Sequence, residues 1–183
     1  MLSDRIFGGT KKGFFSDGAV RVEKAEQDRV FMAEALKEVR KAAKKGEVPV
    51  GAVIVHSGGV LARGHNRRET ALDPTEHAEM MAIRSASRKL GSWRLTGCTL
   101  YVTLEPCLMC MGALLQARVA RLVFAAFDPK AGACGSLYDL SDDSRLNHRV
   151  HVTAGVMGPE ASAELKDFFM GLRAAKRFLR QKG

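Results

Sequence analysis

Two short motifs constrain the fold of this chain more than any other feature of its sequence. The first places His77 and Glu79 two residues apart, and the second is Pro106-Cys107-Leu108-Met109-Cys110. One imidazole and two thiolates are ligands that zinc prefers, and three protein ligands leave the fourth tetrahedral position for water, as in catalytic zinc sites. We therefore expect a fold that brings His77, Cys107 and Cys110 together around one zinc ion per chain.

Glu79 supplies a carboxylate two residues from the predicted ligand His77. Zinc lowers the pKa of a bound water from about 15.7 to about 7, so that hydroxide exists at neutral pH. A carboxylate beside that water can carry protons between the nucleophile and a leaving group. We therefore predict that Glu79 is the catalytic base and acid and is not a zinc ligand.

The Cys107–Cys110 pair admits other interpretations, since the chain has four cysteines. Outside a secreted protein, a Cys-x-x-Cys pair is typical of metal or redox chemistry and not of structural disulfides. A thioredoxin-like redox site would leave the His77 motif without a role. A structural zinc site would need Cys98 or Cys134 as fourth ligand, but neither stands at a standard ligand spacing, and Cys98 lies in a strand pattern that favours a small core residue.

Charge gives the main indication of a partner. The 183 residues carry a formal net charge of +9 and a pI near 9.7. Such a balance favours a polyanion, most simply nucleic acid, although a basic surface can also serve solubility. The length fits one domain. No apolar run approaches the roughly 20 residues needed to cross a bilayer, and no signal-peptide core is present, so we expect a cytoplasmic protein without a membrane partner.

The N-terminal half predicts a tail, a helix and a hairpin. Residues 1–24 show no sustained period and are expected to be a disordered tail, which leaves 25–183 as a single domain. Apolar residues at spacings of three and four predict a helix over 27–45. Strands over 48–56 and 60–64, joined by Ser57-Gly58-Gly59, predict the hairpin.

Each motif is predicted to lie at the start of a helix. Asp73 is a suitable N-cap, with Pro74 at the first helical position, and Thr75 is an alternative cap. Either choice places the His77 motif in the first turn. A strand over 98–105 ends at Pro106, and the helix that follows is apolar nearly all round, which predicts burial in the core or against another subunit.

The remainder predicts two strands, over 121–127 and 148–153, and a helix from Pro159 onward. A glycine-rich loop over 128–136 separates the strands and is predicted to have a functional role. Alternating helices and strands predict an α/β sandwich of three layers. The last helix carries an apolar stripe expected to pack it onto the domain, and basic residues that are candidates for RNA backbone contacts: Arg173, Lys176, Arg177 and Arg180.

Several segments together resemble the bacterial tRNA adenosine deaminases, a group of zinc-dependent nucleobase deaminases with His-x-Glu and Pro-Cys-x-x-Cys motifs. The resemblance covers about residues 27–175 and is carried by Glu47–Val53, Gly64–Arg67, Asp73–Thr75, Trp93–Leu95, Thr99–Cys110, Gly112-Ala113, Asp128–Ser136 and Asp167–Phe169. It implies a cytidine-deaminase-like fold with a central five-stranded mixed sheet, a homodimer, and conversion of the wobble adenosine of a tRNA anticodon to inosine.

The resemblance also implies residue roles. Asn66 is expected to contact the purine, and the Asp128–Gly135 loop, with Asp128 and Lys130, to lie against RNA. His65 is added to these predicted substrate-binding residues because it precedes Asn66 near the mouth of the expected site. Two positions depart from the usual pattern, because Glu76 and Cys134 replace small residues. The alternatives are a free guanine or cytosine/cytidine deaminase, which shares the zinc motif, and an inactive RNA-binding subunit with structural zinc.

Asp128 has two interpretations. A carboxylate can accept a hydrogen bond from a ribose 2′-hydroxyl, which DNA lacks, and so favour RNA. An aspartate before a proline is also a common turn cap.

Overall fold

The computed structural model describes the chain from Asp17 to Lys182. Helix α1 spans Asp17–Ala43 and begins ten residues before the predicted start at Gln27. From Arg21 to Gln27 most residues are good helix formers and all are exposed, so this stretch has no apolar period that sequence analysis would detect. Residues 17–24 are therefore helical, whereas the rest of the predicted tail, residues 1–16, lies outside the described residues.

The five strands form one mixed sheet in the order β2-β1-β3-β4-β5. Strand β1 (Gly51–His56) pairs antiparallel with both β2 (Gly59–His65) and β3 (Thr99–Leu104). Strand β4 (Arg121–Ala126) is parallel to β3 and to β5 (His151–Ala154). The predicted hairpin and five-stranded mixed sheet are confirmed, although β5 begins three residues later than the predicted start at His148.

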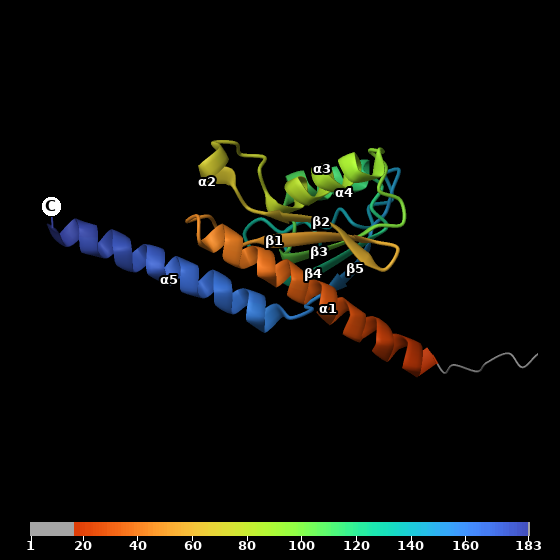
Figure 1. The fold of residues 1–183 in the computed structure, drawn as a ribbon, viewed down its shortest axis with the longest axis horizontal. Helices are drawn as coiled ribbons and strands as arrows, with labels where there is room; N and C mark the ends of the chain where they lie inside the picture. Colours follow the sequence, from red (N-terminus) through yellow and green to blue (C-terminus); the bar gives the residue numbers. More distant parts are fainter. Residues whose placement is uncertain (1–16, 183) are drawn as a thin grey trace, which may run out of the picture.

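Helices cover both faces of the sheet (Figure 1). On one face lie α3 (Ala78–Leu90) and α4 (Leu108–Gln116), which share a core with Leu100, Val102 and Phe124. On the other face, α1 and the first part of α5 (Gly158–Lys182) pack on the alternate residues of the same strands. The predicted three-layer sandwich is confirmed. The short helix α2 (Arg68–Ala71) belongs to the loop between β2 and α3.

Two glycines allow helices to approach the hairpin closely. A Cβ atom at Gly51 would lie 2.2 Å from the carbonyl oxygen of Ala35 in α1. A Cβ atom at Gly64 would lie 2.1 Å from the carbonyl oxygen of Ala78, at the start of α3. Such contacts are impossible for any side chain, so Gly64 fixes the N-terminus of α3 directly against the end of β2.

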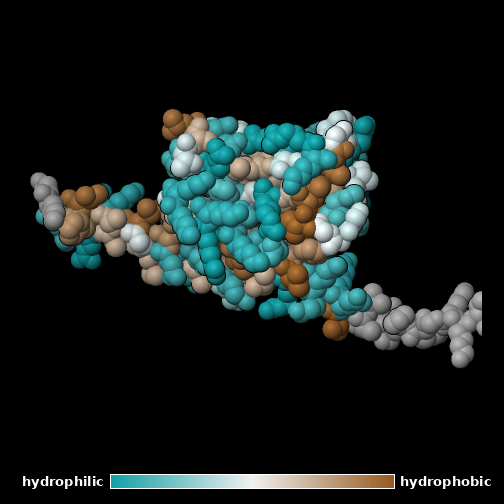
Figure 2. Space-filling view, viewed as in Figure 1, coloured by the Kyte–Doolittle hydropathy of each residue, from teal (hydrophilic) through white to brown (hydrophobic). Residues whose placement is uncertain are grey.

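Helix α5 departs from the prediction in its C-terminal part. Ala161 is buried and Leu165 is half-buried, but the predicted stripe is exposed from Phe169 onward, with Leu172 and Leu179 open to solvent. The prediction that this stripe packs the helix onto the domain is therefore wrong beyond Phe168. Figure 1 shows the helix running well past the sheet toward the C-terminus, where there is no core for it to cover. Figure 2 shows hydrophobic residues on the surface of this projecting part.

The start of α3 also differs from the prediction. The N-cap is His77 itself, four residues after the predicted cap Asp73. Asp73 instead closes a turn, because its Oδ1 accepts hydrogen bonds of 2.7 Å from both the backbone N–H and the hydroxyl of Thr75. Among residues 17–182, no helix is long and apolar enough to span a membrane.

Candidate active site

Two helix N-termini bring the motifs together. His77 is the N-cap of α3, and Cys107 is the N-cap of α4, so each motif begins where free backbone N–H groups and the positive end of a helix dipole are found. Cys110 lies one turn into α4 and is buried. The sequence prediction that both motifs open helices is confirmed, with His77 one position before the first helical residue.

The three predicted ligands fit a zinc ion. The Nδ1 atom of His77 lies 3.8 Å from Sγ of Cys107 and 3.6 Å from Sγ of Cys110. All three ligand atoms lie within 4.8 Å of one another. Tetrahedral zinc, with Zn–N of about 2.0 Å and Zn–S of about 2.3 Å, requires N···S separations of about 3.5 Å. The three side chains are therefore positioned to bind a zinc ion.

A fourth protein ligand is not part of this group. Within residues 17–182, His77, Cys107 and Cys110 form the one cluster of three or more side chains with metal-ligand geometry, and neither Cys98 nor Cys134 belongs to it. Both of these cysteines are buried and free. The arrangement has the ligand count of a catalytic zinc site and leaves one position for water.

Hydrogen bonds among His77, Cys107 and Cys110 shift the pKa values of all three side chains. Hydrogen bonds from Cys110 and then His77 outweigh burial and lower the pKa of Cys107 to about 4. The hydrogen bond with Cys107 raises the pKa of His77, partly opposed by burial. The bond with Cys107 and burial both raise the pKa of Cys110, so zinc binding must release the Cys110 proton.

Glu79 shares a cavity with the ligands. Its side chain is buried, and this burial raises the pKa of the carboxyl group above its usual value. The hydrogen bond from its own backbone N–H and the charge of His77 oppose the rise, and the charge of a bound zinc ion would oppose it further. The cavity is lined by Val48, Val50, Asn66, Arg68, His77, Ala78, Glu79, Leu104, Glu105, Cys107, Asp128 and Ala131.

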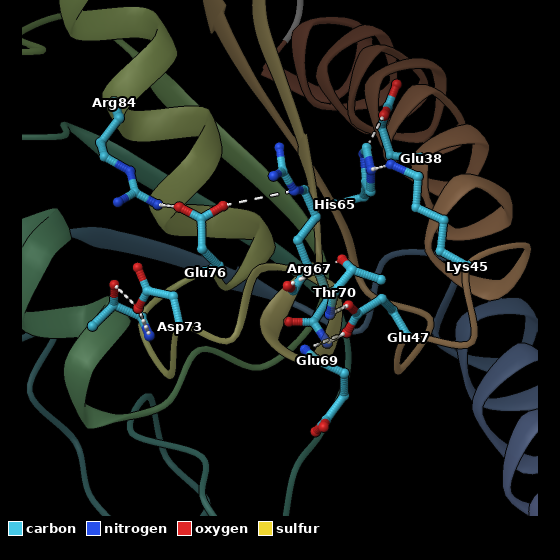
Figure 3. A network of polar contacts seen from close by, with 12 residues as sticks. Glu38, Lys45, Glu47, His65, Arg67, Glu69, Thr70, Asp73, Glu76 and Arg84 are labelled. Atoms are coloured by element: carbon cyan, nitrogen blue, oxygen red, sulfur yellow. Dashed lines mark hydrogen bonds and ion pairs between the residues drawn. The ribbon is translucent and has the colours of Figure 1, made fainter.

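The structure separates the four predicted substrate-binding residues into two pairs. Asn66 and Asp128 line the cavity. His65 and Lys130 do not line it. The ring of His65 faces α1 instead, with Nδ1 3.4 Å from Oε2 of Glu38 and Nε2 3.3 Å from Nζ of Lys45 (Figure 3). Lys130 is exposed. Strand alternation explains the difference between His65 and Asn66, because adjacent residues at the end of β2 point to opposite faces of the sheet.

The loop over 128–136 is organised by a residue that sequence analysis did not single out. Glu105 is buried, and its carboxylate accepts hydrogen bonds from the backbone N–H groups of Asp128 (3.0 Å), Cys134 (3.0 Å) and Ser136 (3.1 Å) and from the Ser136 hydroxyl. A Cβ atom at Gly132 would lie 2.4 Å from this carboxylate. The available sequence signal was an acidic residue at the end of an otherwise apolar strand.

Asp128 closes a turn within this loop. Its Oδ1 accepts hydrogen bonds from the backbone N–H groups of Lys130 (2.9 Å) and Ala131 (3.3 Å). The turn-capping interpretation of Asp128 is therefore confirmed, and any contact with a ribose would be additional to it.

The unusual Glu76 has nearby partners. Its carboxylate forms an ion pair with Arg84 of α3, and its other oxygen lies 3.9 Å from Nε of Arg67 (Figure 3). The added charge beside the ligand His77 is thus balanced by two arginines.

The basic residues of α5 lie far out on the helix. Around a shallow groove on its projecting part gather Arg173, Lys176, Arg177, Arg180 and Gln181. All five are exposed, so the positive charge of this segment faces solvent.

Comparison with known proteins agrees with this site. Residues 25–126 match the cytidine and deoxycytidylate deaminase zinc-binding region. The chain is 50% identical over 155 residues to the tRNA-specific adenosine deaminase of Bacillus subtilis (strain 168), covering 85% of this chain and 96% of that protein.

Two solved structures have the same fold. One comes from a study of A-to-I editing by tRNA A34 deaminases at the wobble position of transfer RNA, with a TM-score of 0.72, 44% identity, and coverage of 74% of this chain and 98% of that one. The other is the guanine deaminase of Nitrosomonas europaea, with a TM-score of 0.64, 28% identity, and coverage of 76% and 83%. The chain therefore belongs to the zinc-binding cytidine and deoxycytidylate deaminase family, in which the tRNA-specific adenosine deaminases are among its relatives.

Proposed function

We propose that this protein is a hydrolase that converts the wobble adenosine of a tRNA anticodon to inosine. The observation that carries the proposal is the cavity itself, which combines the His77, Cys107 and Cys110 group with the buried carboxylate of Glu79. The similarity to tRNA-specific adenosine deaminases over most of both chains supports the choice of substrate within the family.

The proposed reaction replaces the 6-amino group of adenine with oxygen from water and releases ammonia. A zinc ion held by His77, Cys107 and Cys110 would supply Lewis-acid activation of the attacking water at neutral pH. Glu79 accepts the proton that this water loses and delivers it to N1 of the ring. Glu79 then takes the remaining proton of the added water and delivers it to the departing amine, which leaves as ammonia, so that one carboxylate makes both proton transfers.

An RNA substrate agrees with the burial of the site and with the net charge of the protein. A target base must leave its stack to reach a buried zinc site, and the unpaired nucleotides of an anticodon loop permit this at lower cost than a duplex does. The net charge of +9 favours a polyanion. Arg173, Lys176, Arg177 and Arg180 are the proposed contacts to the RNA backbone.

A homodimer and a cytoplasmic location complete the proposal. An apolar groove between α3 and α4 is lined by residues that include Ile83, Trp93 and Ala113. Trp93 is 55% exposed, and Leu108, at the start of α4, is 47% exposed. This face is the proposed dimer contact, and it agrees with the sequence prediction that α4 packs in the core or against another subunit.

The proposal is tested by incubating the purified protein with tRNA and sequencing the RNA for adenosine-to-inosine changes. Conversion at one wobble position supports the proposal. Deamination of free guanine or cytosine with no change in tRNA would instead establish a free-base deaminase. Binding of tRNA without any deamination would establish an inactive RNA-binding subunit.

Glu79→Ala gives the matching test of mechanism. We expect this variant to retain one zinc per chain but to lose about a hundredfold to ten-thousandfold in deamination rate, since general acid–base catalysis typically contributes 10²–10⁴-fold. Zinc content by elemental analysis and single-turnover rates provide the two measurements. Loss of zinc from the purified variant would show that Glu79 is a ligand and would contradict its assigned role.

A further inference from the structure

Glu47 is the most deeply buried carboxylate beside the cavity, although it does not line the cavity itself. Its side chain is 0% exposed. Oε1 accepts a hydrogen bond of 2.7 Å from the backbone N–H of Thr70, and Oε2 accepts one of 3.2 Å from the N–H of Glu69 (Figure 3). These bonds outweigh the effect of burial, so the pKa of Glu47 is lower than usual and the group is ionised.

A third hydrogen bond reaches a residue of the cavity wall. Nδ2 of Asn66 lies 3.4 Å from Oε2 of Glu47. An ionised carboxylate can only accept hydrogen bonds, so the nitrogen of the Asn66 amide, and not its oxygen, must face Glu47. The backbone of Asn66 is fixed as well, because its N–H donates to the carbonyl oxygen of Val50 at 3.1 Å.

We propose that Glu47 is a positioning residue that fixes the amide orientation of Asn66 and thereby decides which polar atom of Asn66 meets the substrate base. With Nδ2 held on Glu47, Oδ1 is the polar atom of the Asn66 amide that is left to face the cavity, which Asn66 lines. The site therefore presents a hydrogen-bond acceptor, and in adenosine the only N–H donor of the base that can meet it is the 6-amino group. This inference rests on the proposed function for its substrate but not for the side-chain geometry.

Glu47→Gln tests the inference because it keeps the size of the side chain and replaces one acceptor oxygen with an NH₂ donor. The remaining oxygen is expected to keep the shorter bond of 2.7 Å from the N–H of Thr70, which puts the NH₂ group in the place of Oε2. There it conflicts with Nδ2 of Asn66 and with the more distant N–H of Glu69, and the first conflict is relieved when the Asn66 amide turns over. The reversed amide would then present its NH₂ group to the cavity. A donor that meets a donor on the base loses its hydrogen bond, which is expected to lower kcat/KM by about tenfold to a hundredfold, mainly through KM.

Glu38→Gln is the matched control. Glu38 is also a buried carboxylate, but its partners are Lys41, Arg63 and His65, none of which lines the cavity. We expect this variant to keep kcat/KM within about threefold of the unmodified protein.

The pair Glu47 and Asn66 can be examined further with Asn66→Ala and the double variant. If Glu47 acts through Asn66, Glu47→Gln should change kcat/KM by less than about threefold in the Asn66→Ala background. An equal loss of kcat/KM in both backgrounds would mean that Glu47 acts through helix α2, by its bonds to Glu69 and Thr70, and would overturn the inference. An unchanged kcat/KM in Glu47→Gln would overturn it as well.

A second readout does not depend on catalysis. In ¹⁵N-labelled protein, the side-chain NH₂ signals of Asn66 are identified by their absence in Asn66→Ala. We expect Glu47→Gln to shift these signals and to speed their exchange with solvent, since the bond to the carboxylate is lost. If the unmodified protein fails to deaminate tRNA, the proposed function fails while this measurement still decides the role of Glu47. Signals that stay unchanged in Glu47→Gln would reject that role.

Discussion

At the scale of single residues, two buried carboxylates hold segments that line the cavity. Glu105 holds the loop that carries Asp128, and Glu47 holds Asn66 and the turn after it. Each is almost fully buried, and each accepts backbone N–H groups that would otherwise lack partners. Glu47 thus caps the first turn of α2, where the N–H groups of Glu69 and Thr70 have no acceptor within the helix, and Glu105 adds side-chain bonds to a loop that also has backbone hydrogen bonds.

Asp128 offers a prediction at this scale. Its turn-capping bonds to Lys130 and Ala131 need only an oxygen acceptor, which asparagine also has. Asp128→Asn should therefore keep the loop but remove the charge that repels phosphate and strengthens a bond to the 2′-hydroxyl. We expect activity on single-stranded DNA relative to RNA to rise about tenfold, compared on matched oligonucleotides at one ionic strength. An equal decrease on both substrates, or a lower melting temperature with no change in the ratio, would leave Asp128 as a turn cap alone.

At the scale of elements, α5 has two parts with different surroundings. Its first part packs against the sheet through Ala161 and Leu165. The projecting part carries exposed apolar side chains beside Arg173, Lys176, Arg177 and Arg180. A helix that covers no core owes its position to its continuity with the packed part.

Neutralising Arg173, Arg177 and Arg180 to glutamine tests whether this projecting part contacts RNA. Each lost phosphate contact should reduce the slope of log affinity against log salt by about 0.7 to 0.9. The control replaces Arg21, Lys24 and Arg29, which are exposed on α1. Binding is followed by fluorescence anisotropy of a labelled anticodon stem-loop from 50 to 300 mM salt. The same slope in both triple variants would show that the charges of α5 are only solvated.

At the scale of the whole molecule, the buried carboxylate of Glu47 makes the stability of the folded protein depend on pH. The pKa of Glu47 is lowered in the folded protein, since the hydrogen bonds from Thr70 and Glu69 more than offset its burial. A group with a depressed folded pKa stabilises the protein above its unfolded pKa, about 4.3 for glutamate, and this contribution disappears as the pH falls through the folded value.

The resulting prediction compares the unmodified protein with Glu47→Gln in urea unfolding at several pH values. At pH 7 we expect the variant to be less stable by about 2 kcal/mol, the range for hydrogen bonds to a charged group. The difference should shrink below about pH 4, because a protonated glutamate resembles glutamine. Loss of zinc in acid affects both proteins and cancels in the difference. A difference that stays constant with pH would contradict the role of the ionised carboxylate.

Periodicity and composition were enough to predict the main elements. Strands β1 to β4, the hairpin, the three layers and the helices that carry the two motifs all follow from local patterns. Errors arose where a segment lacks a core partner: the early start of α1 and the exposed end of α5 are helical stretches whose apolar pattern carries no information about packing. The cap of α3 was misplaced because Asp73 satisfies a turn equally well.

Residue types and their spacings were enough to indicate the chemistry of this protein, because the ligand set, the neighbouring carboxylate and the excess of positive charge can all be read from the chain. Tertiary structure decided which of the candidate residues meet the ligands. His65 and Asn66 are adjacent in the chain, yet one faces α1 and the other lines the cavity. The roles of Glu47 and Glu105 could be identified only in the folded structure, because a hydrogen bond between residues distant in the chain produces no periodic pattern in the sequence. Residue type and spacing indicate the chemistry that a side chain can perform, whereas tertiary packing decides which groups it contacts.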